Sequence, residues 1–397
     1  MICPMRSSCL SCRSCTGSTR QILDLGMSPV ANRLIDEPHD IAPHYPLGLV
    51  QCQVCGLVQN STKLPSALLF EDNYPYYASV SSAVRQHACS LASALAHRLT
   101  SNSRTLEIGS NDGAVQIALA QHGIKCLGVD PAHGPALVAR AAGMQTRVGT
   151  FDTNMADEIL TDNEPFDAVH MSNVLAHVGD PTLLLNEAAR CLSDDGVLLV
   201  EVQSWLALAQ SGGFDMVYHE HHSHFSLSSL AYLFTSCGFS ITDVETHNMQ
   251  GGSVRIWAKK GAAHSDTILA AIATEAALLA SAPNQLNAAL AQFRHDAESY
   301  LAELGNTPLY GYGAAAKTVT LLAASGLRWP LLAVADAAAS KIGRFLPLDG
   351  IPIIAPTELP PEDGEMLLFA WNLASEIVPN YPNWRIHVPV PHLRRLQ

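Results

Sequence analysis

The sequence predicts an α/β protein of three parts, a small cysteine-rich module followed by two domains built on parallel sheets. Six of the ten cysteines lie in the first 55 residues. From residue 104 strand-like and helical segments alternate, which is typical of a parallel sheet with helices on both faces. The alternation restarts at residue 308 after an Ala-rich helical stretch, so we place the three parts at 1–65, 66–262 and 263–397.

The elements follow from hydrophobic periodicity and from glycine and proline positions. A helix is expected over 83–99, and Pro283 is expected to interrupt the helical connector. The strands expected in the two sheets are 104–109, 125–130, 166–172, 196–202, 239–247, 253–260, 308–313, 331–336 and 365–371. The helices expected between them are 115–123, 135–143, 181–192 and one that begins near Ala314.

Composition limits the classes of function. The chain of 397 residues is 48% hydrophobic and 15% charged, which is unlike a disordered chain. Its net charge of −13 argues against binding to a nucleic-acid backbone. The first residues lack the apolar core of a signal peptide, and no uncharged apolar run reaches the roughly 18–20 residues of a membrane span. We therefore expect a cytoplasmic protein with neither nucleic acid nor membrane as a partner.

Two cysteine pairs at the N-terminus predict a structural zinc site. Cys12 and Cys15 form one C-x-x-C loop, and Cys52 and Cys55 form the other. Two such loops can direct four thiolates to one tetrahedral ion. Cys9 could replace a member of the first pair, and a set of free cysteines remains the alternative.

A glycine turn opens the second part of the chain and predicts a nucleotide-type cofactor. The turn contains Gly109, Asn111 and Gly113, between a strand and a helix. Asp130 ends the next strand, where a carboxylate can accept the hydroxyls of a ribose. Glu107 is placed to contact an amino group of the cofactor. Asn111 in the middle of the turn disfavours a pyrophosphate, so S-adenosylmethionine (SAM) is favoured over NAD and over a turn without ligand.

Two further residues are candidates for the same cofactor. Phe151 follows the third strand-like run and could flank adenine or belong to the core. Asn173 ends the strand over 166–172, and His177 lies just beyond it, at the edge where ligands bind in such sheets.

The segment Tyr218-His219-Glu220-His221-His222-Ser223-His224 combines imidazoles with a carboxylate. Such a cluster suits proton transfer near neutral pH. A metal site is the rival hypothesis, because His219, Glu220, His221 and His224 are all plausible ligands. A solvated loop is the third.

Several motifs together resemble the sugar C-methyltransferases of antibiotic deoxysugar pathways, such as those that branch mycarose or tetronitrose. The motifs, in order, are CRSC, LDLGMSPVANRL, YPLGLVQCQVCGLVQ, YPYYASVSS, LEIGSNDG, SNVLAHVGDP, FDMVYHEHHSHFS, GGSVRIWA, GYGAAAKTVTLL, DAAASKIGRFLPLDGIPI and WNLASEI. The resemblance implies an N-terminal zinc-binding module, a central Rossmann-like SAM methyltransferase domain and a C-terminal Rossmann-like domain. It also implies a nucleotide-linked 4-keto-6-deoxysugar as substrate, held between the last two domains.

The resemblance assigns roles by position. It implies His221 as general base, and it adds Tyr76, His177, Tyr218 and Glu220 to the active site; Tyr77 is the alternative to Tyr76. The nucleotide-binding residues that it implies are Gly311, Gly313, Lys317, Asp336 and Lys341. A glycine turn that only packs against its own sheet is the alternative for this loop.

The sequence therefore predicts methylation at the carbon next to a ketone, at C-3 or at C-5 of a sugar linked to a nucleotide such as dTDP. Methylation of oxygen or nitrogen in another small molecule remains open, as does a non-catalytic nucleotide-sugar-binding protein. The sequence does not determine the oligomeric state.

Overall fold

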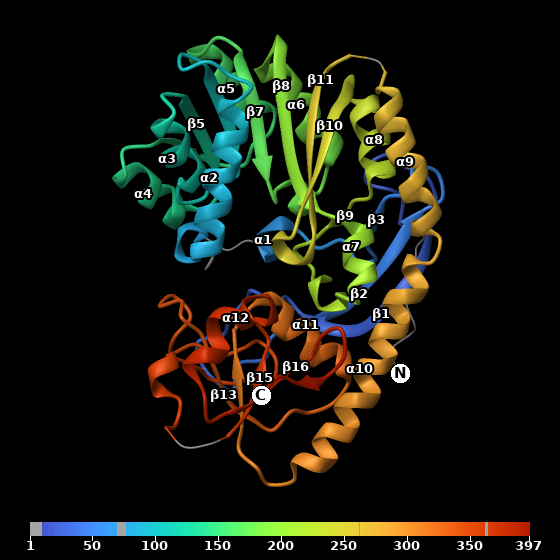
Figure 1. The fold of residues 1–397 in the computed structure, drawn as a ribbon, viewed down its shortest axis with the longest axis vertical. Helices are drawn as coiled ribbons and strands as arrows, with labels where there is room; N and C mark the ends of the chain where they lie inside the picture. The colour runs from blue at the N-terminus through green and yellow to red at the C-terminus, as the bar shows by residue number, and fades with distance from the viewer. Residues whose placement is uncertain (1–9, 70–76, 262, 362–363) are drawn as a thin grey trace.

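The computed structural model describes residues 10–69, 77–261, 263–361 and 364–397. They form three sheets, and Figure 1 shows the largest above the C-terminal sheet, with the N-terminal strands beside both. This arrangement agrees with the predicted three-part α/β fold.

The central sheet has the order β10-β11-β8-β7-β4-β5-β6. Strands β4 to β8 run parallel, as predicted, and the β10–β11 hairpin extends the sheet in antiparallel fashion. The predicted strands 239–247 and 253–260 agree with the observed bounds. The strands are β4 (Arg104–Ile108), β5 (Lys125–Asp130), β6 (Gln145–Val148), β7 (Phe166–Ser172), β8 (Leu192–Gln203), β10 (Phe239–His247) and β11 (Ser253–Lys260).

Helices cover both faces of this sheet. One face packs against α2 and α3, through buried residues such as Leu91 and Leu119. The other face packs against α5, α6 and α8, through residues such as Ile159, Leu185 and Leu230. The helices of this region are α2 (Ser82–Ala96), α3 (Ala114–Gln121), α4 (His133–Ala141), α5 (Thr153–Asp162), α6 (Pro181–Cys191), α7 (Trp205–Gln210) and α8 (Leu227–Ser236).

The N-terminal sheet contains a strand from the central part of the chain. Its order is β1-β2-β3-β9, and β9 comes from the histidine segment. The elements here are β1 (Thr19–Pro29), β2 (His44–Cys52), β3 (Val58–Asn60), α1 (Ser66–Leu69) and β9 (Ser223–His224). The domain boundaries stay predictions, but this shared sheet joins the first part of the chain to the second.

The connector consists of α9 (Asp266–Leu279) and α10 (Ala282–Leu304). The break precedes Pro283, which lies in the first turn of α10, where a missing N–H costs no helical hydrogen bond. Figure 1 shows α10 running along the side of the molecule to the C-terminal sheet. Among the described residues, no single helix meets the length and hydropathy of a membrane span; α9 and α10 do so only together, across a 42° bend.

The C-terminal sheet has the order β14-β13-β12-β15-β16-β17, and all but β17 run parallel. Helix α11 begins at Ala316, two residues later than predicted, because Gly313 and Ala314 donate their N–H groups to β13 and to Asp336. The elements are β12 (Leu309–Tyr312), α11 (Ala316–Ser325), β13 (Leu331–Ala335), β14 (Ile353–Ile354), β15 (Glu365–Leu368), α12 (Ala374–Ile377), β16 (Arg385–Val388) and β17 (Arg394–Arg395).

Candidate functional site

The four predicted zinc ligands converge at one point. The Sγ atoms of Cys12 and Cys55 lie 3.5 Å apart, those of Cys15 and Cys52 lie 3.4 Å apart, and all four lie within 4.8 Å of one another. A tetrahedral ion with Zn–S bonds of about 2.3 Å requires sulfur atoms about 3.8 Å apart, so the four thiols fit zinc. Cys9 lies outside the described residues.

Hydrogen bonds prepare these thiols for a cation. The backbone N–H of Ser14 donates to Cys12 Sγ, and that of Val54 donates to Cys52 Sγ. A hydrogen bond from Cys55 lowers the pKa of Cys12, against the opposing effect of burial. Zinc is the structural cofactor of this module. The four cysteine thiolates would hold the ion, which would tie the two loops together.

The glycine turn after β4 has the backbone geometry that a bound ligand requires. Gly109, Asn111 and Gly113 all have positive φ, at 74°, 48° and 83°. Asp130 fixes the turn, because its two carboxylate oxygens accept the N–H groups of Asn111 and Ala132, both at 2.8 Å. Each oxygen retains a second lone pair for a ribose hydroxyl.

Buried carboxylates at this turn provide a test of SAM binding. Glu107 is 4% exposed, and its Oε2 has no hydrogen-bond partner among the described residues. Burial, together with the charges of Asp130 and Asp112, raises the pKa of Glu107 well above its usual range. An unpaired buried carboxyl group is costly, and the cationic amino group of SAM would satisfy it.

The other two candidate cofactor residues differ in their surroundings. Phe151 is buried in the hydrophobic core of the central sheet, so core packing explains this side chain without a ligand. Asn173 adopts a positive φ of 57° directly after β7, and its N–H donates to the Glu201 carbonyl at 2.9 Å. This left-handed residue turns the chain away at the carboxyl edge of the sheet.

A segment that precedes α2 covers the glycine turn. The 3-10 helix η1 (Ala78–Val80) donates two backbone N–H groups, from Ala78 to Asn111 Oδ1 and from Ser79 to Asp112 Oδ2, both at 2.9 Å. No sequence pattern singles out these two donors. The predicted Tyr76 lies outside the described residues.

The histidine segment is buried and holds His221 in one tautomer. His221 Nδ1 lies 2.9 Å from the Met216 carbonyl, which can only accept, so Nδ1 carries the proton. Nε2 then accepts from the Tyr218 hydroxyl at 2.7 Å. Burial lowers the pKa of His221 well below its usual range, as do His177 and His224, so the ring is neutral and can accept a proton.

The other predicted active-site residues differ in their contacts with His221 and Tyr218. The ring of His177 lies 4.7 Å from that of His221, and its Nδ1 donates to the Glu220 carbonyl at 2.9 Å. The Oε1 atom of Glu220 accepts the Asn32 N–H at 3.0 Å. The contact that orients the His221 ring comes from the Met216 carbonyl, at 2.9 Å from Nδ1.

The rival metal hypothesis gains no support from this segment. Within the part of the chain that the structure describes, only the four cysteines and the set Glu107, Cys126 and His170 bring three ligand atoms together. The side chains of this segment have separate partners: His219 Nε2 contacts the Pro46 carbonyl, whereas the His224 ring lies 6.2 Å from the Trp205 ring at a tilt of 59°.

The N-terminal module holds the histidine segment through Asn60, a residue that the sequence did not reveal. Its N–H donates to the His222 carbonyl at 3.1 Å, and its Nδ2 donates to the carbonyls of Tyr218 and His219 at 2.9 and 3.3 Å. The last residue of β3 thus fixes the backbone on both sides of Glu220. The cysteine module and the candidate base are one connected structure.

The C-terminal glycine loop repeats the geometry of the SAM loop. Asp336 accepts the N–H groups of Ala314 and Ala338, both at 2.8 Å, as Asp130 does in the central sheet. Lys341 Nζ contacts Asp336 Oδ2 at 3.2 Å and the Ala314 carbonyl at 2.9 Å.

Packing explains the two glycines of this loop. A Cβ at Gly311 would lie 2.7 Å from Phe369, and one at Gly313, where φ is 98°, would lie 2.9 Å from Ala370. The packing of the sheet thus requires both glycines, whether or not a ligand binds. The case for ligand binding at this loop therefore rests on its charged residues.

Lys317 connects this loop to the histidine segment. Its Nζ lies 4.7 Å from the ring centre of Trp371, and burial lowers its pKa to about 8. Trp371 Nε1 in turn donates to Asp215 Oδ2 at 2.9 Å. Asp215 lies in the 3-10 helix η3 (Phe214–Met216), which carries the carbonyl that orients His221.

These features together define a methyltransferase that uses SAM and has a structural zinc site. Three matched families agree, described as "Putative zinc binding domain" over 12–70, "Methyltransferase domain" over 81–244 and "C-methyltransferase C-terminal domain" over 248–387. The chain belongs to the C-methyltransferase family that includes C-methyltransferase NovU of Streptomyces niveus. It is 32% identical to NovU, over 94% of this chain and 93% of NovU.

Two further similarities each cover less than half of this chain. The ubiquinone biosynthesis O-methyltransferase of Azorhizobium caulinodans is 33% identical over 24% of this chain and 39% of that protein. The structure of magnesium protoporphyrin IX methyltransferase from Synechocystis PCC 6803 with bound SAM has a TM-score of 0.35 and 14% identity, over 44% of this chain and 78% of that chain.

Proposed function

We propose that this C-methyltransferase acts on a nucleotide-linked 4-keto-6-deoxysugar, with a dTDP-sugar as the expected form, at the carbon next to the ketone. C-3 is the expected position and C-5 the alternative. The observation that carries the proposal is the neutral His221, which is fixed by the Met216 carbonyl and contacted by the Tyr218 hydroxyl. Methylation on oxygen or nitrogen needs no base for a carbon acid, whereas methylation next to a ketone does.

His221 is the proposed general base. Its Nδ1–H is held by a carbonyl, so Nε2 is the nitrogen that accepts the proton from the sugar carbon. The Tyr218 hydroxyl, 2.7 Å from Nε2, must first turn away. By turning to the developing enolate oxygen, it would free the base and stabilise the negative charge in one movement.

His177 is better suited to shape the pocket than to donate to the enolate. Its Nδ1–H is engaged by the Glu220 carbonyl, and burial lowers its pKa to about 4. The remaining nitrogen of this neutral ring accepts rather than donates. Among the described residues, Tyr218 is therefore the proposed donor to the enolate oxygen.

The cofactor supplies an electrophilic methyl group on a sulfonium. The chain's part is to hold that group close to the sugar carbon, through Asp130, Glu107 and the covering segment η1. Correct positioning of two reactants contributes much of the rate in such transfers.

The C-terminal loop is the proposed site for the nucleotide diphosphate. Lys317 supplies a positive charge near the start of α11, and the N-terminus of a helix favours an anion. Through Trp371 and Asp215, this lysine is also in contact with the turn that orients His221. Support for the sugar itself comes from the resemblance of the motifs, and a panel of nucleotide-linked keto-deoxysugars tests it.

Hydrogen exchange tests the base directly. In D2O, with a non-reactive SAM analogue bound, the parent enzyme should introduce deuterium at the carbon next to the ketone. His221→Ala should lose this exchange, on the order of 10²–10⁴-fold, and still bind both ligands. His222→Asn is the matched control, because His222 neighbours the base in sequence but contacts Asn60 through its carbonyl.

Two results would contradict the proposal, one for the base and one for the acceptor atom. Exchange at the parental rate in His221→Ala would remove His221 from the role of base. A product whose new methyl group is on oxygen or nitrogen, seen by NMR, would refute the proposal of a sugar carbon as acceptor.

A further inference from the structure

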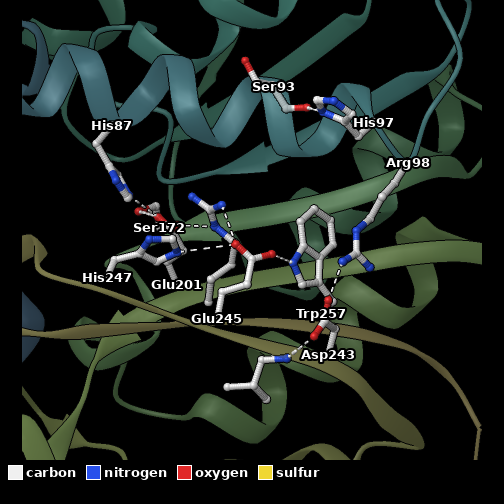
Figure 2. Close-up of polar contacts among 12 residues, drawn as sticks. His87, Ser93, His97, Arg98, Ser172, Glu201, Asp243, Glu245, His247 and Trp257 are labelled. Carbon is white, nitrogen blue, oxygen red and sulfur yellow. Dashed lines mark hydrogen bonds and ion pairs between the residues drawn. The ribbon is translucent and has the colours of Figure 1, made fainter.

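A buried charged cluster lies on the face of the central sheet that α2 covers (Figure 2). Glu201 on β8, Arg255 on β11 and Glu245 on β10 are neighbours across three adjacent strands. Arg255 Nε lies 2.6 Å from Glu201 Oε1, and its Nη1 lies 3.1 Å from Glu245 Oε2. The side chains of Arg255 and Glu201 are each 2% exposed.

Stability alone does not explain such a cluster. Desolvation of two charges offsets most of their attraction, and apolar residues of similar size often stabilise a core equally well. Burial opposes ionisation of Glu201, but contacts from His87, Arg255 and Ser172 outweigh it and lower its pKa to about 2. Glu201 is therefore held as a carboxylate with a fixed orientation.

One side of the Glu201 carboxylate reaches Asn173, the proposed SAM contact. The Ser172 hydroxyl donates to Glu201 Oε2 at 2.8 Å, and Asn173 Nδ2 donates to the Ser172 oxygen at 3.3 Å. The Glu201 carbonyl also accepts the Asn173 N–H at 2.9 Å. Glu201 thus fixes both the backbone and the side chain of this left-handed residue.

The same carboxylate oxygen also holds helix α2. His87 Nε2 lies 2.8 Å from Glu201 Oε2, and Figure 2 shows the ring directed from the helix towards it. Helix α2 directly follows η1, whose Ala78 and Ser79 contact the SAM turn. Glu201 is therefore the point at which the segment that covers the turn and the end of β7 are joined.

We propose that Glu201, oriented by Arg255, is a positioning residue for SAM. Through Ser172 it sets Asn173, and through His87 it holds η1 over the glycine turn. The inference rests on the proposed SAM site, and it names the residues that hold this site in place. It requires that SAM affinity depend on these contacts, whereas the affinity for the nucleotide-linked substrate does not.

Calorimetry with SAM tests the inference on the full chain loaded with zinc. Ser172→Ala breaks the connection to Asn173 and leaves the buried ion pair intact, so it should weaken SAM binding roughly 3–10-fold without a change in the unfolding temperature. Glu201→Gln should weaken it roughly 10–100-fold. In both variants KM for SAM should rise while KM for the sugar substrate stays at the parental value.

His87 provides a rescue experiment. His87→Ala should weaken SAM binding roughly 10-fold, whereas His87→Gln, which keeps an N–H donor at a similar reach, should restore binding to within roughly 3-fold of the parent. A role in packing alone would make the two variants equal, and that result would overturn the inference.

Arg98 is the matched control for helix anchoring. It follows α2, donates to Asp243 at 2.7 Å and lies 3.9 Å from the ring centre of Trp257, at the other end of the cluster in Figure 2. Arg98→Ala should lower the unfolding temperature and leave SAM affinity unchanged. Equal loss of SAM affinity in Arg98→Ala and His87→Ala would overturn the inference. If Asn173→Ala binds SAM like the parent, the proposed SAM site itself is wrong.

Discussion

Asn60→Ala tests whether the zinc-binding module positions the catalytic segment. Asn60 is 1% exposed, and its amide group holds the carbonyls of Tyr218 and His219. Each such hydrogen bond contributes about 0.5–1.5 kcal/mol net, and the substitution removes both, although the Tyr218 carbonyl still accepts the His221 N–H at 3.0 Å. A total of about 1–3 kcal/mol then opposes the active arrangement of the segment.

If that free energy is lost from the arrangement that reacts, kcat falls roughly 5–150-fold, at about 1.4 kcal/mol for each factor of ten. The glycine turn and the four cysteines are unchanged, so SAM affinity and zinc content should equal those of the parent. The assay is methyl transfer from labelled SAM at saturating substrate, together with calorimetry for SAM and metal analysis of the same preparation.

Gln59→Ala is the neighbouring control. The Gln59 side chain contacts the backbone of Arg13 and Ser11 in the first cysteine loop and does not reach the histidine segment. It should weaken zinc retention and leave kcat of the zinc-loaded enzyme near the parental value. A folded, zinc-loaded Asn60→Ala enzyme with parental kcat would refute the reasoning.

Four further predictions concern single contacts. Cys52→Ser should lower zinc content by metal analysis and also lower kcat, because the loop that begins after Cys52 leads directly into β3; unchanged zinc content would contradict the metal site. Asp130→Ala should weaken SAM binding by about 1.5–3 kcal/mol in calorimetry, and unchanged affinity would remove Asp130 from the pocket. Lys317→Ala should raise KM for the nucleotide-linked substrate and leave SAM binding intact. Equal KM values in variant and parent would favour a glycine turn that only packs against its own sheet. Burial raises the pKa of Glu220 from 4.5 to about 7, so the free energy of unfolding of the parent should fall by about 3 kcal/mol as pH rises through this window. Urea unfolding of Glu220→Gln should lack this fall, and an equal slope in both proteins would contradict the assignment.

Local patterns in the sequence predicted most strands of the two larger sheets and both glycine turns, because strand, turn and helix are adjacent in the chain. The strands β14, β16 and β17 were not predicted, and the strand expected over 365–371 ends at Leu368. Asp130 could be paired with the first turn for the same reason: the next strand of an alternating α/β pattern lies beside the first. The four cysteines could be grouped because their spacing reflects the geometry of one ion. These features need no knowledge of distant contacts.

Contacts between distant segments could not be predicted in this way. Nothing near Asn60 or Trp371 reveals that one holds the histidine segment and the other contacts Asp215. Arg255 did carry a signal, since a charged residue within the apolar run SVRIWA needs a buried partner, but the identity of Glu201 as that partner depends on the register of β8 and β11.

The pairing of β3 with β9 has a consequence for synthesis of the chain on the ribosome. The cysteine loops are complete once Cys55 has emerged, so zinc can be captured early. The third strand of that sheet nevertheless keeps an unpaired edge until Ser223 and His224 follow, after β4 to β8 have been made. An open strand edge invites pairing with other chains. Nascent chains that stop short of β9 should therefore be the ones that aggregate, even with the metal in place.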